Sequence, residues 1–173
     1  IDRNGGLLNK NGFSFNEIKD LYLNRNGNQL QATNLLPLET IKKEIWHTEA
    51  EIFIPAAASR LIHKEHLKGL IDKGLEMISC GANVPFADNE IFFGSIAEYA
   101  DSHVTVIPDF IANCGMARVF RYLMGDQVEI SDNAIFSDVS SCIGGALKEV
   151  HTRHPESVRL SQAALEWSIE KLI

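Results

Sequence analysis

The chain has 173 residues, of which 45% are hydrophobic and 23% charged, a balance typical of one globular domain. The net charge of −7, with lysines and arginines scattered along the chain, argues against a nucleic-acid-binding protein. No apolar run approaches the ~20 residues that span a bilayer and no signal peptide is recognisable, so we expect a cytoplasmic protein without a membrane partner. Three widely spaced cysteines, an odd number, fit a reducing compartment better than a disulfide framework.

The N-terminal third begins in what reads as the end of a strand. Residues 1–6 pass from an isoleucine into a Gly-rich turn with no strand before it, so we expect a preceding piece of the fold to be absent. Residues 15–22 carry apolar side chains at helical spacing behind Ser14, the predicted N-cap. A polar loop over residues 24–34 and a short helix around residues 40–46 follow.

The middle third alternates between strand and helix patterns. Three apolar runs predict strands, at residues 52–54, 75–80 and 104–107. The first of these reads as a buried strand that ends at Pro55. Helical patterns predict helices that start within residues 56–62 and span residues 66–73 and 88–100. This βαβαβ order predicts an α/β fold with a parallel sheet and right-handed crossovers.

The rest of the chain has helical periodicity throughout. Helices are predicted over residues 116–124, 133–152 and 155–172, the last with Pro155 near its first turn. We interpret Gly144 and Gly145 as a place of close helix packing, because no turn or phosphate-binding Lys-Ser/Thr follows them. Such a tail is expected to pack on the sheet or on a neighbouring domain.

Two Asn-bearing turns are the main functional signal. Residues 81–85 read Gly-Ala-Asn-Val-Pro and residues 108–115 contain Asn113, and each segment directly follows a predicted strand. The carboxyl ends of parallel strands share one sheet edge, where open α/β folds bind ligands. An amide both donates and accepts hydrogen bonds, as a nicotinamide carboxamide or a ribose requires. Either turn alone is as well explained by a plain structural turn. Two such turns after successive strands, with Ala56 and Ala57 at the end of a third strand, favour a binding site.

Other candidate residues carry weaker signals. Asp2 stands where a dinucleotide-binding fold keeps an acid for the ribose hydroxyls, but no G-x-G-x-x-G precedes it, so a plain turn residue is the alternative. Arg3 could instead meet a 2′-phosphate, which leaves NAD and NADP open. Two histidine pairs three residues apart have no third ligand, so we predict no metal. Cys80 and Cys114 lie beside the turns and are read as buried thiols rather than nucleophiles.

At these positions the chain resembles the glutamate/leucine/phenylalanine/valine dehydrogenase family, and within it most closely the glutamate dehydrogenases. Residues 2–7 look like the family's S-D-S-x-G-G segment, and residues 52–57 are similar to its I-x-I-P-x-A strand. Residues 81–85 look like its G-A-N-x-P-T turn, and residues 107–115 resemble I-P-D-x-x-A-N-A-G-G. The four motifs keep the family's order and spacing over residues 1 to about 125.

The resemblance implies a Rossmann-like doubly wound parallel sheet, incomplete at its N-terminus, with a C-terminal helical tail. Residues 1–125 would form a partial dinucleotide-binding domain and residues 126–173 helices that pack on it. The implied reaction is the oxidative deamination of an L-amino acid to a 2-oxo acid and ammonia, with NAD or NADP as cofactor, in a homo-oligomeric full-length enzyme. No catalytic residue is expected in this chain, because the family's Lys and Asp lie upstream, so the chain alone should be inactive.

The resemblance also assigns residues, and some of them depart from the family pattern. Asp2 would face the adenosine ribose, the backbone of Ala56 and Ala57 would line the dinucleotide, and Asn83 and Asn113 would hold the nicotinamide. Phe120 takes the substrate-binding position where a glutamate enzyme has Ser, Met116 replaces the second Gly of A-G-G, and Ser59-Arg60 replaces an acidic-Asn pair. An apolar or atypical amino-acid substrate remains open, as does a non-catalytic nucleotide-binding or regulatory module derived from the family.

Overall fold

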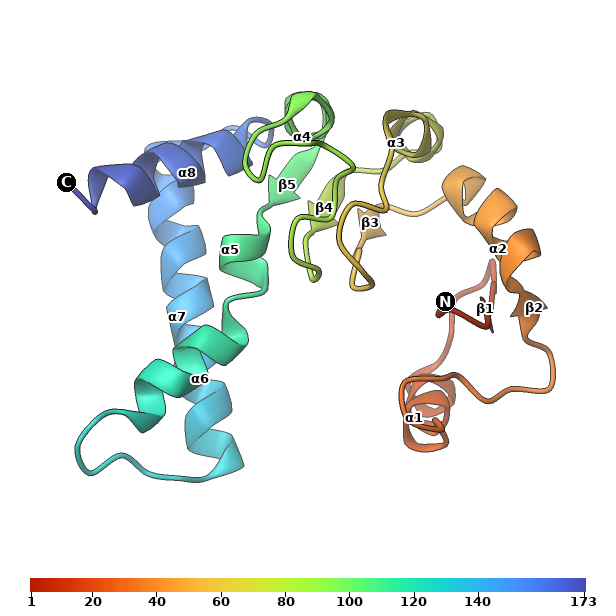
Figure 1. Cartoon of the computed structure of the whole chain (residues 1–173), viewed down its shortest axis with the longest axis horizontal. Coiled ribbons are helices and arrows are strands. Elements are labelled where there is room, and N and C mark those ends of the chain that lie inside the picture. Colours follow the sequence, from red (N-terminus) through yellow and green to blue (C-terminus); the bar gives the residue numbers. More distant parts are fainter.

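Three short parallel strands form the centre of the fold. The computed structural model describes residues 1–173, and its central sheet contains β3 (Ile52–Phe53), β4 (Met77–Ser79) and β5 (Thr105–Ile107) in that order. Ile52 pairs with Met77, and Met77 pairs with Thr105. The structure confirms the α/β class and the parallel sheet, because every strand is separated from the next by a helical crossover (Figure 1).

The crossover helices α3 (Lys64–Ile71) and α4 (Ser95–His103) lie together on one face of this sheet (Figure 1). Ten buried residues form the core between them, centred on Leu67 and Ile78, whose side chains have no exposed surface. Ile78 is in the middle strand, so it is covered by a strand on each side as well as by the helices. This core fixes the three strand ends relative to one another.

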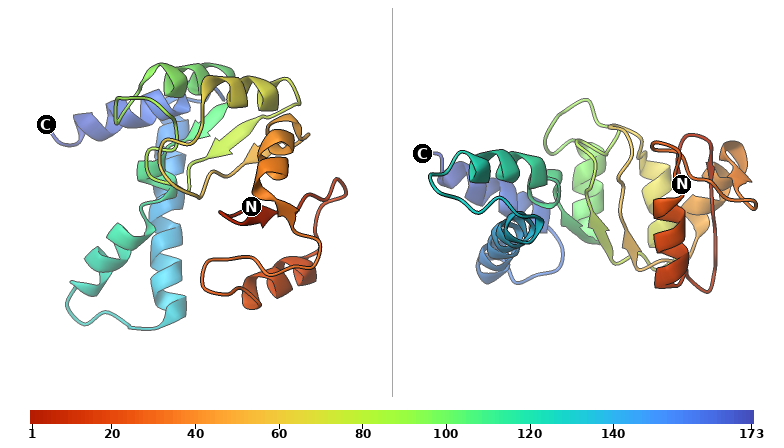
Figure 2. Two further views of the ribbon diagram at one scale, coloured as in Figure 1. Left: turned by 45° about the vertical axis from the view of Figure 1, so that its right-hand side comes forward. Right: turned by 90° about the horizontal axis from the view of Figure 1, so that it is seen from below.

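The first 47 residues form a separate arm (Figures 1 and 2). It contains β1 (Gly5–Gly6), α1 (Phe15–Leu23), β2 (Leu36–Pro37), α2 (Leu38–Glu44) and the 3₁₀ helix η1 (Ile45–His47). Ser14 caps α1 as predicted, in a reciprocal capping box with Glu17. The segment around Ile1 is not the end of a strand in the central sheet: Asp2 pairs with Gly5, and β1 pairs with β2 in an antiparallel ladder.

Two predictions for the middle third are wrong because contacts distant in sequence replace helical hydrogen bonds. Residues 56–62 form turns, since the N–H groups of Arg60, Leu61 and Ile62 donate to carbonyl oxygens of the turn after β4. Residues 88–94 are also not helical. The buried carboxylate of Asp88 accepts the N–H groups of Ile96 and Ala97, so α4 begins only at Ser95.

The prediction of a buried first strand is also wrong. Ile52 is 57% exposed and Ile54 62% exposed, because β3 has a neighbour on one side only. An edge strand keeps part of its apolar surface open, which an apolar run in the sequence does not reveal.

The C-terminal third is helical, as predicted. It contains α5 (Asp109–Ala112), α6 (Gly115–Leu123), α7 (Asp132–Arg153) and α8 (Leu160–Glu170). The last helix starts five residues later than predicted, since Arg159 has φ +61° and Asp101 of α4 caps the N–H groups of Ser161 and Gln162. α8 contacts β5 and α4. α6 packs on the lower half of α7, and together they form a second arm that extends away from the sheet (Figure 1). None of the helices has the length and apolar character that crossing a bilayer would require.

The glycine pair of α7 does not mark close helix packing, contrary to the prediction. A Cβ atom added at Gly144 or at Gly145 would meet no atom within 4 Å. Both glycines therefore lower helix stability without a visible packing role.

Replacing Gly144 or Gly145 with alanine is accordingly expected to raise the free energy of unfolding by about 0.5–1 kcal/mol each, because alanine loses less conformational freedom in a helix. Urea unfolding followed by circular dichroism measures the change. A loss of stability in either variant would contradict the open space around these two glycines.

Candidate functional site

The two predicted amides meet at the carboxyl edge of the sheet. Asn83 follows β4 and Asn113 follows α5, which comes directly after β5. The Nδ2 group of Asn113 donates a hydrogen bond to Oδ1 of Asn83 at 2.7 Å, and both residues are exposed. The structure therefore brings together, from adjacent parallel strands, the two side chains that the sequence singled out.

This hydrogen bond leaves a donor group on one amide and an acceptor atom on the other available. Nδ2 of Asn83 and Oδ1 of Asn113 have no partner within the protein. A primary carboxamide carries the complementary acceptor and donor, and a ribose hydroxyl can satisfy either group. The exposed pair is thus chemically suited to hold a carboxamide or a sugar.

The end of β3 lies beside the turn after β4. The N–H group of Ala82 donates to the carbonyl oxygen of Pro55 at 2.8 Å, and a Cβ atom added at Gly81 would lie 3.2 Å from Cβ of Ala56. Ala56 and Ala57 themselves are exposed. Small residues on both turns let the two backbones approach, and they leave backbone groups open to a ligand.

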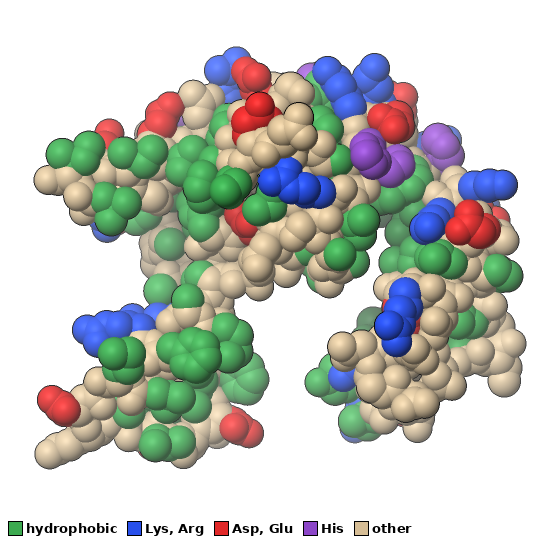
Figure 3. Space-filling model, viewed as in Figure 1, with side chains coloured by type: hydrophobic (Ala, Val, Ile, Leu, Met, Phe, Trp, Pro, Cys, Tyr) green, Lys and Arg blue, Asp and Glu red, His purple; other side chains and the backbone are tan.

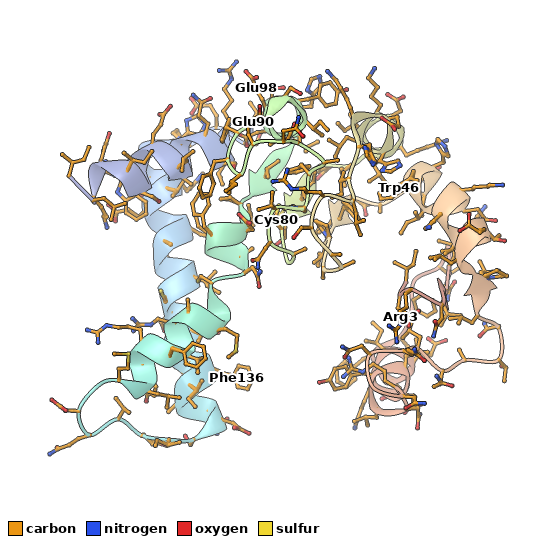
Figure 4. The ribbon with its side chains drawn as sticks, viewed as in Figure 1. Arg3, Trp46, Cys80, Glu90, Glu98 and Phe136 are labelled. Carbon is orange, nitrogen blue, oxygen red and sulfur yellow. The ribbon has the colours of Figure 1, made fainter.

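Asp2 and Arg3 lie on the other arm. The carboxylate of Asp2 accepts the N–H groups of Asn4 at 2.7 Å and Leu30 at 2.5 Å, and these hydrogen bonds, chiefly that from Leu30, lower its pKa. Arg3 is exposed there, well apart from Cys80 at the end of β4 (Figure 4). The structure does not bring these two residues to the amide pair.

Phe120 lies on α6, which begins two residues after Asn113. It is 62% exposed, and Met116 and Leu123 on the same helix are exposed as well. Apolar side chains gather over this arm in the space-filling view (Figure 3). Phe120 belongs to this apolar surface, and its side chain has no group that could form a hydrogen bond with a polar substrate.

A small cavity of about 50 Å³ lies beneath the turns, far below the roughly 300–1,000 Å³ of a typical ligand pocket. Cys80, Asp88, Asp109 and Phe110 are among its lining residues, whereas neither amide reaches it. Burial raises the pKa of Cys80 to about 12, so its thiol is protonated at neutral pH and is not a nucleophile. The cavity is packing space rather than a substrate site.

The histidine pairs have local partners. His66 stacks on Trp46 with ring centroids 4.0 Å apart, its Nδ1 accepts the N–H group of His63 at 3.2 Å, and burial lowers its pKa. His154 places Nε2 2.7 Å from the carbonyl oxygen of Val158. No group of three or more His, Cys, Asp or Glu side chains is arranged to hold a metal ion.

Sequence reasoning missed Asp109, which connects the two turns. Its carboxylate accepts the N–H group of Val84, the residue after Asn83, at 2.7 Å. An aspartate in the first turn of a helix, two residues after a strand, can accept backbone N–H groups, but its long-range partner is not visible in the sequence.

Comparisons with known proteins identify the family of the chain. The profile of the family described as Glutamate/Leucine/Phenylalanine/Valine dehydrogenase matches residues 1–172. An NADP-specific glutamate dehydrogenase of Psychrobacter sp. (strain TAD1) is 30% identical over 112 residues, which are 61% of this chain and 22% of that protein. The chain therefore spans about a fifth of the length of this curated relative.

Two solved structures share the fold. A glutamate dehydrogenase of Plasmodium falciparum superposes with a TM-score of 0.60 at 15% identity, over 94% of this chain and 36% of that one. Glutamate dehydrogenase 2 of the same organism gives a TM-score of 0.58 at 20% identity, over 95% and 38%. With the family profile covering nearly every residue, the chain belongs to the glutamate/leucine/phenylalanine/valine dehydrogenase family.

Proposed function

We propose that this chain is the cofactor-binding part of an NAD(P)-dependent amino-acid dehydrogenase that converts an L-amino acid to a 2-oxo acid and ammonia. The observation that carries the proposal is the exposed amide pair, Asn113 to Asn83 at 2.7 Å, on the carboxyl ends of parallel strands. Family membership supports the reaction class, and the NADP-specific relative supports a nicotinamide cofactor.

In this proposal the free donor of Asn83 and the free acceptor of Asn113 hold the carboxamide of the cofactor. The nicotinamide, when bound, supplies the hydride-accepting carbon. The chain's own residues orient the ring, and the exposed backbone at Ala56 and Ala57 lets the dinucleotide approach closely. The catalytic Lys and Asp come from another part of the enzyme, which we propose to be a cytoplasmic homo-oligomer.

NAD and NADP both remain within the proposal. Asp2 or Arg3 would make the adenosine-side contacts, with the ribose hydroxyls or with a 2′-phosphate, once the N-terminal arm approaches the sheet edge. The carboxylate of Asp2 accepts two N–H groups and keeps further lone pairs that can accept a hydrogen bond.

A second candidate function is a nucleotide-binding module without catalysis. Met116 and Phe120, 64% and 62% exposed, support it, because a bulky apolar pair replaces the small and polar residues that the family places after Asn113. Phe120 is equally compatible with an apolar amino acid as the substrate.

The test is a titration of NADH and of NADPH onto the chain, followed by nicotinamide fluorescence. Asn83→Ala and Asn113→Ala are each expected to weaken binding about tenfold, because each removes one hydrogen bond worth about 1–1.5 kcal/mol. Asn89→Ala, an exposed amide outside the pair, is the control and should bind like the wild type. Absence of binding by the wild-type chain would contradict the proposal.

Turnover separates the two candidates. The protein that contains both this chain and the substrate domain is expected to reduce NAD or NADP when supplied with an amino acid from a broad panel. Retained dinucleotide binding with no reduction for any amino acid would favour the non-catalytic module.

A further inference from the structure

One aspartate contacts both amide-bearing turns. We propose that Asp109 is a positioning residue: it holds the Asn83 turn and the Asn113 turn in the relative placement that lets the two amides act on one ligand. Only the dinucleotide-binding measurement below rests on the proposed function, because the NMR measurements report on the amide pair itself.

The side chain of Asp109 holds the first turn. Its Oδ2 accepts the N–H group of Val84 at 2.7 Å, while Oδ1 accepts the N–H group of Phe110 at 2.9 Å. Both carboxylate oxygens therefore accept a hydrogen bond. A side chain with an N–H donor in place of either oxygen cannot make both bonds. Val84 is the immediate neighbour of Asn83 and transmits this restraint to it.

The main chain of Asp109 holds the second turn. Its carbonyl oxygen accepts the N–H group of Asn113 at 2.7 Å, and Ala112 donates to Pro108 at 2.9 Å, which completes the short helix α5. Asn113 is thus placed by the backbone of the same residue whose side chain places Val84. No other residue of the structure is hydrogen-bonded to the backbone of both Val84 and Asn113.

Val84 needs such a restraint. Its φ of +45° lies in the left-handed region, which a β-branched side chain disfavours. Its carbonyl oxygen also accepts the N–H group of Arg60 at 2.8 Å, so both of its backbone polar groups are held. Without the bond to Asp109 the backbone can relax towards negative φ, and this rotation moves Asn83 away from Asn113.

The test is Asp109→Asn in the full chain, read out on the amides themselves. An asparagine has the same shape but points an NH₂ group at Val84 or at Phe110, both of which are donors, so one bond is lost. NMR should show hydrogen exchange at the Val84 amide at least tenfold faster. The Asn113 side-chain NH₂ resonances, assigned with Asn113→Ala, should move towards those of a free amide. NADH or NADPH binding should weaken about tenfold.

Asp88→Asn is the matched control. It makes the same chemical change at another carboxylate that accepts two backbone N–H groups, those of Ile96 at 2.8 Å and Ala97 at 2.9 Å, and it contacts neither Asn83 nor Asn113. It should leave the Asn113 resonances and the Val84 exchange unchanged. Adding Val84→Gly to Asp109→Asn should restore part of the wild-type spectrum, because glycine adopts positive φ without cost.

Three results would overturn the inference: a wild-type Asn113 spectrum and Val84 exchange rate in Asp109→Asn, equal effects of Asp88→Asn, or no rescue by Val84→Gly. Should Asp109→Asn not fold, the same measurements are made on Asp109→Glu, which keeps both acceptors but displaces them and is expected to shift the same resonances. A wild-type chain that binds no dinucleotide would refute the proposed function, while the spectra would still decide the role of Asp109.

Discussion

Replacing Gly69 with alanine is expected to lower the free energy of unfolding by about 2 kcal/mol. A Cβ atom at this position of α3 would overlap the backbone carbonyl oxygen of Trp46 in η1 and would lie 3.2 Å from Nδ1 of His47. A backbone atom cannot rotate away, so α3 must move from η1 and the stacking of Trp46 on His66 must loosen. Overpacking of this kind costs about 1–3 kcal/mol, more than alanine gains in helix propensity.

Urea unfolding monitored by tryptophan fluorescence measures the effect, since Trp46 is itself at the contact. Gly144→Ala is the matched control, because it makes the same change inside a helix with no atom in the way and is expected to act in the opposite direction. Equal stability of the two variants would refute the close approach of α3 and η1.

Replacing Asp101 with alanine is expected to cost about 2 kcal/mol and to loosen the C-terminal helix. Asp101 is 2% exposed, and its carboxylate accepts the N–H groups of Ser161 at 2.9 Å and Gln162 at 3.0 Å, so a side chain of α4 caps α8. The alanine variant leaves both N–H groups without this acceptor. Asp126→Ala, an exposed aspartate without a hydrogen bond, should change stability by less than about 0.5 kcal/mol.

The cost should depend on pH in a definite direction. Burial raises the pKa of Asp101 above its ordinary value of 3.8, against the opposing effects of the two N–H donors and of His154 and Arg159. Between 3.8 and the raised pKa the folded protein keeps a proton that the unfolded chain releases, so the stabilisation by this group is lost as the pH rises. The difference between wild type and Asp101→Ala should be largest near pH 4 and should shrink at higher pH; a difference that grows with pH would contradict this assignment.

Local chemistry made much of the fold readable from the sequence. Ser14 and Glu17 lie three residues apart, the spacing of a capping box, and they form one at α1. The alternation of apolar runs and helical patterns predicted that β3, β4 and β5 form a parallel sheet, which the structure confirms. The Asn-bearing turns followed from their position after these strands, and their meeting at 2.7 Å agrees with that prediction.

The errors occur where one segment supplies hydrogen-bonding groups to another. Residues 56–62 have a helical composition, but their N–H groups donate to the turn after β4. The sequence predicts helices that start at residues 88 and 155, but α4 and α8 begin later. Asp88, outside α4, caps the start of α4, and Asp101 of α4 caps the start of α8.

The sequence by itself determined the family, the parallel sheet and the two amides, since these depend on residue types at short spacings. Only the tertiary structure decided where α4 and α8 begin, which glycines have room for a side chain, and that Asp109 restrains Val84. The physical reason is that a carboxylate or carbonyl oxygen satisfies whichever N–H group the folded chain brings within about 3 Å, and no local pattern specifies a partner 25 residues away.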